Sequence, residues 1–365
     1  MLSVLRKTDN FGIFESHCDY TPITALLAGV DFTQIEMELN KHLDYSHRRT
    51  WRYPPILLFK LLIVLAFRKQ TYRTVVNSLT TEDCIALEMK EISSSVFQIP
   101  CSSTLHDFAY NRLGLDGFKK IMELNGSIAC KFIRNGHGMI DSTPIETSRY
   151  DRYAKYNPHY ETKMYKMHIF HMDAFPLYEI FSSGTDSDDK YALPLAEKIS
   201  GMNPELKSLQ LDGGYDSYLI HAGLWKIFNI NPLIDMGKNA VFHKEGTENR
   251  IDHWVNKLWK KGGQIHNSIE NKLIFLYNNG REKQVGMYLR NQNLIKADFK
   301  AEYKSRSDCE RTHSHMKRMF HFTVKWVQQR SKEFYMAFRF VSYQTILLAR
   351  LLKLEPDIQN FSQYI

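Results

Sequence analysis

The spacing of apolar residues before residue 135 is helical along most of its length. The segments with this spacing are 31–43, 56–79, 105–113 and 117–134. The dipeptide Pro54-Pro55 supports a helix start at the second segment, because proline fits the first turn of a helix. We therefore predict an all-helical N-terminal domain over residues 1–135, which is either a DNA-binding module or a small helical bundle with solvated charges.

The pattern changes at Gly138, where short β-type runs begin. The predicted strands are 139–145, 163–170, 177–181, 206–211 and 232–234, and the predicted helices are 189–199 and 217–228. Strands that first form a meander and then alternate with helices predict a mixed sheet with helices on its faces. Residues 136–237 are thus expected to be the first part of an α/β core.

Residues 238–300 break this rhythm and are rich in basic side chains. They contain twelve Lys and Arg against six Asp and Glu. Asn278-Asn279-Gly280 lies between the apolar runs 273–277 and 284–289, which is typical of a β-hairpin. The segment is therefore expected to be a basic, β-containing insertion.

Residues 301–365 are expected to return to the core. A polar helix over 303–317 is followed by a long amphipathic helix over 334–354. We expect the second helix to pack on the sheet and close the domain.

Composition and charge limit the class of protein. The chain has 365 residues, of which 43% are hydrophobic and 13% aromatic, so it can bury a sizeable core. Its net charge of +8 favours a polyanionic partner without proving one. The five cysteines lack CxxC spacing, and no apolar signal-peptide core opens the chain. These features predict free thiols and a cytoplasmic protein.

Four side chains between residues 303 and 317 fall on one stripe if the segment is a single helix. Tyr303, Arg306, Glu310 and Lys317 then project within an arc of about 60°. A solvated helix face could show the same pattern. A carboxylate flanked by cations also suits a metal ligand beside a phosphate backbone.

Two further acids occupy unusual positions. Asp141 interrupts an apolar strand, where a charge is costly unless it is paired or metal-bound. Asp212 ends another strand, where ligands collect in open α/β sheets. With Glu310 they predict a site for two Mg²⁺ ions, with Mn²⁺ as an alternative, that assists phosphoryl transfer. We interpret the nearby Asp216 as a helix cap.

These motifs resemble a known family. The spacing of Tyr303, Arg306, Glu310 and Lys317 matches the Y-(2)-R-(3)-E-(6)-K pattern of DDE insertion-sequence transposases of bacteria and archaea. The sequences IDST at 140–143 and LDGGYDS at 211–217 resemble the first and second acidic motifs of that family. The resemblance spans roughly residues 30–355.

The resemblance implies an RNase H-like fold and metal-dependent cleavage and strand transfer at terminal inverted repeats of a prokaryotic mobile element. It assigns Asp141, Asp212 and Glu310 as the catalytic, metal-binding triad. The DNA contacts expected on this basis are Tyr303, Arg306, Arg311, Lys317, Lys325, Trp254 and Trp259. The expected partners are double-stranded DNA, both transposon ends and target, and a second copy of the chain, at the nucleoid.

Two alternatives stay open at this point. A metal-dependent nuclease on the same fold needs the same triad and would hydrolyse DNA without joining strands. A DNA-binding regulator that has lost catalysis would keep the basic surfaces, although three retained acids argue against it.

Overall fold

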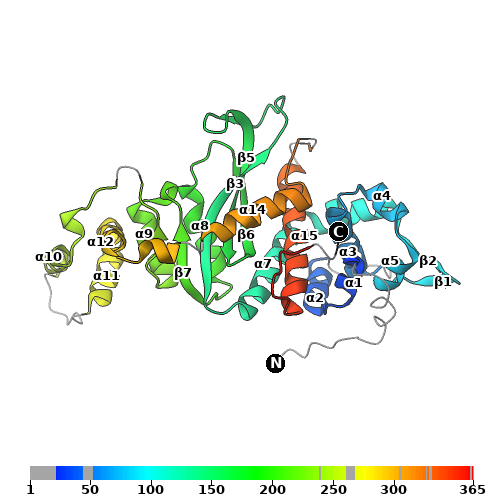
Figure 1. The fold of residues 1–365 in the computed structure, drawn as a ribbon, viewed down its shortest axis with the longest axis horizontal. Helices are drawn as coiled ribbons and strands as arrows, with labels where there is room; N and C mark the ends of the chain where they lie inside the picture. Colours follow the sequence, from blue (N-terminus) through cyan, green and yellow to red (C-terminus); the bar gives the residue numbers. More distant parts are fainter. Residues whose placement is uncertain are drawn as a thin grey trace. The chain divides into compact units, whose positions relative to one another are not determined.

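The computed structural model of the protein (Figure 1) describes residues 22–43, 52–237, 240–259, 268–303, 306–325, 327–328, 331–361 and 364. The chain divides into two compact units. The first takes residues 1–132, 146–153 and 312–365, and the second takes residues 133–145 and 154–311. Within the described part of the chain, no helix combines the length and apolar character needed to cross a membrane.

The first unit is helical and has α15 (Lys332–Leu352) at its centre. Residues around the whole circumference of α15 are buried, from Phe334 to Arg350. Such a helix needs neighbours on all sides, and α15 packs against α7 (Gly114–Phe132), α3 (Pro55–Phe67) and α1 (Ile23–Ala28). The prediction that this helix packs on the sheet was therefore wrong.

The other elements of the first unit are shorter. They are α2 (Thr33–His42), α4 (Tyr72–Asn77), α5 (Thr81–Ala86), β1 (Glu91–Ser93), β2 (Val96–Phe97), α6 (Ser102–Asp107) and the π-helix η2 (Phe108–Leu113). The antiparallel pair β1–β2 corrects the prediction of an all-helical N-terminal domain. Each strand is too short to show a periodic pattern, and Ser95 makes the turn with a positive φ of 58°.

The second unit contains a mixed six-stranded sheet. Its strands are β3 (Gly136–Glu146), β4 (Lys155–Asn157), β5 (Thr162–Met172), β6 (Phe175–Ser183), β7 (Leu206–Leu211) and β8 (Leu233–Ile234). The order is β4-β5-β3-β7-β8, and β6 pairs with β5. The pairs β3–β7 and β7–β8 are parallel, whereas β4–β5 and β5–β6 are antiparallel. This confirms the predicted mixed α/β class.

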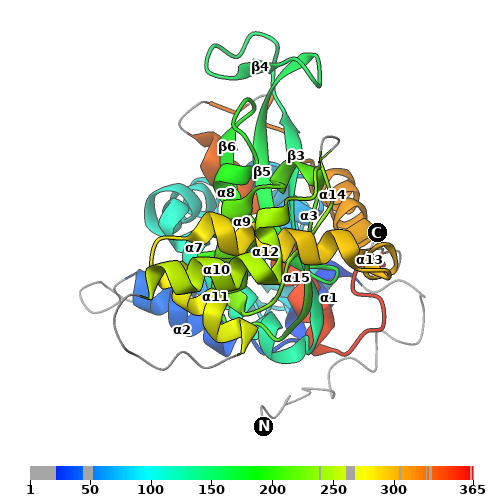
Figure 2. The same cartoon turned by 90° about the vertical axis from the view of Figure 1, so that its left-hand side faces the viewer.

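Helices flank this sheet as predicted. α8 (Asp189–Ser200) packs on β5 and β6, and α9 (Tyr218–Phe228) packs on α8. Both helices bury the apolar side chains that gave the sequence its helical spacing, including Leu195, Ile199 and Leu224. Figure 2 shows these layers from the side of the insertion.

The insertion is helical in its described residues, which corrects the predicted β-hairpin. Its elements are η4 (Lys244–Gly246), α10 (Glu248–Leu258), α11 (Ile269–Asn278) and α12 (Glu282–Ile295). The Asn279-Gly280 turn is real, with Gly280 at φ +70°, but it joins two helices. Leu273 and Leu276 lie three residues apart, and Val285 and Leu289 lie four apart, so each pair buries one helical face.

Candidate catalytic site

Asp141 and Asp212 are brought together by the parallel pairing of β3 with β7. The last registered pair is Ile140 with Leu211, and each aspartate is the next residue along its strand. Asp141 is buried with 8% of its surface exposed, whereas Asp212 follows the end of β7 and is half-buried. Two acids 71 residues apart in sequence thus become neighbours at the end of one strand pair.

Arg306 gathers all three predicted acids around one guanidinium group. Its Nη2 lies 3.6 Å from Asp141 Oδ1 and 3.5 Å from Asp212 Oδ2. Its Nη1 lies 3.9 Å from Glu310 Oε1, one turn further along α14 (Ser307–Phe320). Arg306 was predicted to contact DNA, and in this structure its guanidinium lies within 4 Å of all three acids.

The electrostatics of the site centre on Asp141. Burial raises the pKa of this carboxyl group to about 6, Arg306 opposes the rise, and Asp212 adds to it. The Cys309 thiol lies 3.6 Å from Asp141 Oδ2, and burial raises the pKa of that thiol too. The thiol is therefore a neutral neighbour of the carboxylate, with no sign of nucleophile activation.

Tyr215 belongs to the same neighbourhood, although the sequence gave no reason to select it. Only 1% of its surface is exposed, and its hydroxyl has no hydrogen-bond partner among the described residues. Burial raises the pKa of Tyr215, and Asp188, Asp141 and Asp212 raise it further. The turn after Asp212, where the Tyr215 N–H donates to the Asp212 carbonyl oxygen at 3.1 Å, therefore contains an unsatisfied buried hydroxyl.

The acids fit a hard cation chemically, but they do not form a ready-made metal cage. Within the described ranges, no group of three His, Cys, Asp or Glu side chains stands close enough to hold a metal ion. The donor set is all carboxylate, which is the set that Mg²⁺ prefers. The raised pKa of Asp141 and the orphaned Tyr215 hydroxyl both indicate charge and polarity that a cation would stabilise.

Tyr303 supports the strand end that carries Asp212. Its hydroxyl donates a hydrogen bond of 2.9 Å to the carbonyl oxygen of Leu211, and its ring stacks on Phe299 at 5.4 Å. Tyr303 ends α13 (Phe299–Tyr303), whereas Glu310 lies on α14, which begins at Ser307. The predicted single helix over 303–317 would include residues 304–305, which lie outside the described residues.

Asp216 is an anchor and not the predicted helix cap. Ser217 takes the N-cap position of α9 without a side-chain bond. Asp216 instead forms a two-pronged ion pair with Arg290 of α12, at 2.7 Å to Nε and 2.8 Å to Nη2. Both side chains are buried, so this pair fixes the insertion next to the loop that follows Asp212.

The two tryptophans predicted to contact DNA pack within the insertion. Trp254 and Trp259 are half-buried against its apolar cluster. Lys257 and Arg281 each lie 5.2 Å from the Trp254 ring centre.

The remaining predicted DNA contacts lie on or after α14. Arg311 is exposed and lies 3.4 Å from Asp308. Lys317 follows Glu310 by seven residues and is half-buried, and burial lowers its pKa. Lys325 pairs with Glu146 at 2.6 Å. Of these three cations, Arg311 has the most exposed side chain.

Comparison with known proteins agrees with this geometry. The chain matches the family model described as "Transposase DDE domain" over residues 134–344, more than half its length. The mixed sheet with flanking helices is consistent with the RNase H-like fold expected for such a domain.

A solved structure also shows a weak likeness. It is the cryo-EM structure of a piggyBac transposase synaptic complex with hairpin DNA, at 13% identity and a TM-score of 0.31, covering 92% of this chain and 82% of that one. No curated protein matches the chain. The assignment therefore rests on the domain match, by which the chain belongs to the family of DDE-domain transposases.

Proposed function

We propose that this protein is the DNA transposase of an insertion sequence, which binds terminal inverted repeats, cuts the DNA and joins a 3′-hydroxyl to target DNA. The observation that carries the proposal is the Arg306 guanidinium, which lies within 4 Å of Asp141, Asp212 and Glu310. Acids from two strands and a helix meet there in a chain of the DDE-domain family.

Asp141, Asp212 and Glu310 would hold the metal ions, two Mg²⁺ or Mn²⁺. Bound there, such ions stabilise charge on the attacking and leaving oxygens of an in-line displacement. The residues of the chain prepare this site. Arg306 offsets the mutual repulsion of the acids, and Tyr303 fixes the backbone that precedes Asp212.

Double-stranded DNA is the proposed partner. The net charge of +8 favours a polyanion, and Arg311, Lys317 and Lys325 supply cations on and after the helix that carries Glu310. Two transposon ends must be handled together in cut-and-paste transposition, so we propose that a homodimer acts on them, at the nucleoid.

The test uses the purified chain, labelled transposon-end DNA, a supercoiled target plasmid, and Mg²⁺ or Mn²⁺. We expect cut ends and joined products with the parent protein. We expect neither product with Asp141→Ala or Asp212→Ala. The matched control is Glu197→Ala, which removes an exposed carboxylate from α8 and should leave both products unchanged.

The outcomes separate the three functions. Cut ends without joined products would identify a nuclease and overturn the proposal of strand transfer. DNA binding and in vivo activity that both survive Asp141→Ala would identify a regulator without catalysis.

A further inference from the structure

The exposed tyrosines of the described chain are concentrated in one segment. Four tyrosines are among its exposed large side chains, with these fractions of their surface exposed: Tyr150 74%, Tyr153 65%, Tyr156 56% and Tyr160 46%. All four lie between residues 150 and 160. Tyr156 and Tyr160 both belong to the second unit. Isolated exposed aromatic residues need no explanation, but two such rings on one segment indicate an interaction surface.

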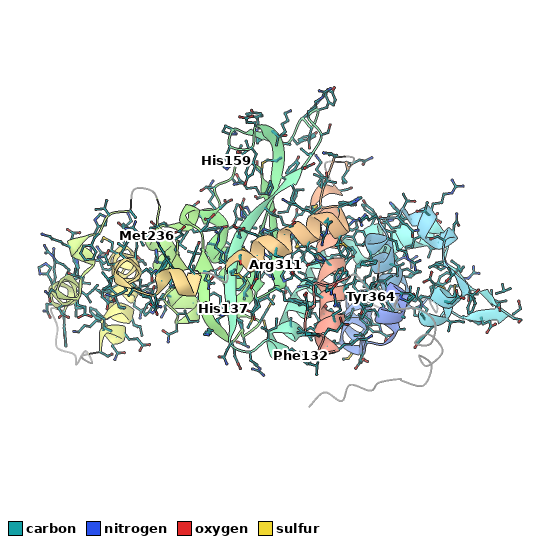
Figure 3. The ribbon with its side chains drawn as sticks, in the orientation of Figure 1. Phe132, His137, His159, Met236, Arg311 and Tyr364 are labelled. Atoms are coloured by element: carbon teal, nitrogen blue, oxygen red, sulfur yellow. The ribbon has the colours of Figure 1, made fainter. Side chains whose placement is uncertain are left out.

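The last two of these tyrosines belong to a built hairpin, here called the arm, which comprises residues 155–163. Tyr156 on β4 pairs with Lys163 on β5, so their side chains share one face of the hairpin. Figures 1 and 2 show the hairpin extending beyond the neighbouring strands of the sheet, and Figure 3 marks His159 at its tip.

Contacts of Asn157, which pairs with Thr162 next to the turn, hold the arm in place. The Asn157 amide nitrogen donates to the carbonyl oxygen of Gly184 at 2.7 Å, and its oxygen accepts from the His159 backbone at 2.9 Å. A Cβ at Gly184 would lie 2.3 Å from the Met164 carbonyl oxygen, so the chain is tightly packed there. These contacts hold β4 against the residue that follows β6.

The arm continues from β5, which lies next to β3, the strand that carries Asp141. Burial raises the pKa of Tyr160, Lys166 opposes the rise, and Asp188, Asp141 and Asp212 add to it. About half of the Tyr160 surface faces solvent. Lys166 stays close by, held at 2.8 Å from Asp188.

A nucleic-acid strand fits this surface better than a protein partner. Exposed aromatic rings interleaved with lysines are typical of sites where bases stack and phosphates are neutralised. On the arm, Tyr156, His159 and Tyr160 supply rings, while Lys155 and Lys163 supply cations. Base stacking is tolerant of sequence, so the surface needs no particular base order.

We infer that the arm is a stacking platform for unpaired bases of the DNA strand that leads to the candidate catalytic acids. This inference rests on the proposed function and adds a binding site to it. The site takes single-stranded DNA through Tyr156 and Tyr160, and the acids take the phosphate to be cut.

The experiment compares two DNA probes with the full-length protein. One is a duplex with a short unpaired tail, and the other is a fully paired duplex of equal length. We expect Tyr156→Ala and Tyr160→Ala to raise the Kd for the tailed probe by about fivefold to about a hundredfold. The paired probe should bind the variants as it binds the parent, and Tyr→Phe variants should retain affinity for the tail.

Phe242→Ala is the matched control, because Phe242 is an aromatic residue 49% exposed outside the arm. Equal losses for Phe242→Ala and Tyr160→Ala would overturn the assignment to the arm, as would unchanged tail binding in both tyrosine variants. A change in oligomer mass without a change in DNA binding would identify the arm as an interface between copies, and would also overturn it.

Cleavage of end DNA is measured on the same samples. Loss of tail binding in the tyrosine variants, with no cleavage by the parent, would refute the proposed function and support the arm. Cleavage by the parent with unaltered tail binding in the variants would refute the arm alone.

Discussion

At the scale of single residues, Arg306 explains how the chain tolerates three acids in one place. A buried carboxylate is costly without a partner, and Asp141 has 8% of its surface exposed. Arg306 lies within 4 Å of Asp141 and of both other acids, so one cation serves the whole group. A divalent ion would meet carboxylates that are already gathered.

Removing the Tyr303 hydroxyl distinguishes two roles for this residue, positioning of the Leu211 backbone and direct contact with DNA. Tyr303→Phe removes the hydrogen bond to Leu211 and keeps the stacked ring. Because one net hydrogen bond contributes about 0.5–1.5 kcal/mol, we expect cleavage at saturating DNA to slow by up to about tenfold. Kinetic assays on end DNA measure the cleavage rate, and equilibrium binding to the same DNA measures the Kd, which should not change.

The control for this variant is Tyr364→Phe, which removes a hydroxyl that bonds Glu355 at 2.9 Å. It should leave the cleavage rate unchanged. A higher Kd with an unchanged rate for Tyr303→Phe would instead support the DNA contact that the sequence predicted.

The ion pair of Asp151 with Lys332 predicts a pH dependence of stability. Both side chains are buried at 5% exposure. Burial opposes ionisation of Asp151, but hydrogen bonds from Lys332 and Thr147 outweigh it and lower the pKa. Because the pKa of Asp151 is lower in the folded protein than in the unfolded chain, its ionisation stabilises the fold at any pH above the unfolded-chain pKa of about 3.9. This stabilisation is lost as the pH falls through the pKa of the folded state.

We therefore expect Asp151→Asn to lower the free energy of unfolding by about 3–5 kcal/mol at neutral pH, since it leaves Lys332 buried without its charge partner. Below about pH 4 the difference between parent and variant should shrink. Denaturant unfolding at both pH values checks this. The exposed-site control Asp116→Asn should change the free energy of unfolding little. A difference between Asp151→Asn and the parent that does not depend on pH would contradict the lowered pKa of Asp151.

At the scale of elements, the contact between α12 and α9 depends on one glycine. A Cβ added at Gly286 would lie 1.8 Å from the Tyr218 carbonyl oxygen, which is backbone and cannot rotate away. We expect Gly286→Ala to destabilise the second unit by about 1–3 kcal/mol or more, because overpacking forces the helices apart. Limited proteolysis should then cut the insertion faster in the Gly286→Ala variant than in the parent protein.

Gly201→Ala provides the control for Gly286→Ala. Its Cβ would meet only the Lys198 carbonyl oxygen at 3.5 Å, which is ordinary contact. Equal proteolysis of the Gly286→Ala variant and the parent would show that the two helices can separate without loss of stability.

At the scale of the whole molecule, ion binding should couple to stability. A ligand that binds only the folded state adds about 2.7 kcal/mol at a hundred times its Kd. We expect Mn²⁺ or Mg²⁺ to raise the melting temperature of the parent protein. Asp141→Ala should abolish the increase, because it removes one of the three carboxylates proposed to hold the ions, the one that lies 3.6 Å from Arg306.

Thermal unfolding with increasing metal measures this coupling without any DNA. Glu197→Ala keeps the three acids and should respond like the parent. An equal metal response in the parent and in Asp141→Ala would place the ion elsewhere and count against the triad.

Much of the fold could be predicted because periodic patterns reflect local burial. The strand at 206–211 was predicted at its observed bounds. The pattern failed where apolar runs were short. Residues 273–277 suit a strand or a helix by composition, and burial against Ala222 and Trp225 of α9 decides for the helix.

The candidate site divides in the same way. The sequence by itself determined the mixed α/β class and selected Asp141, Asp212 and Glu310, because charges in apolar strands and motif spacing are local properties. Only the tertiary structure decided that Arg306 lies among the acids, that Tyr303 supports Leu211, and that Asp216 pairs with Arg290. Those contacts join residues up to 165 positions apart (Asp141 to Arg306), and spacing along a chain does not specify which distant side chains meet.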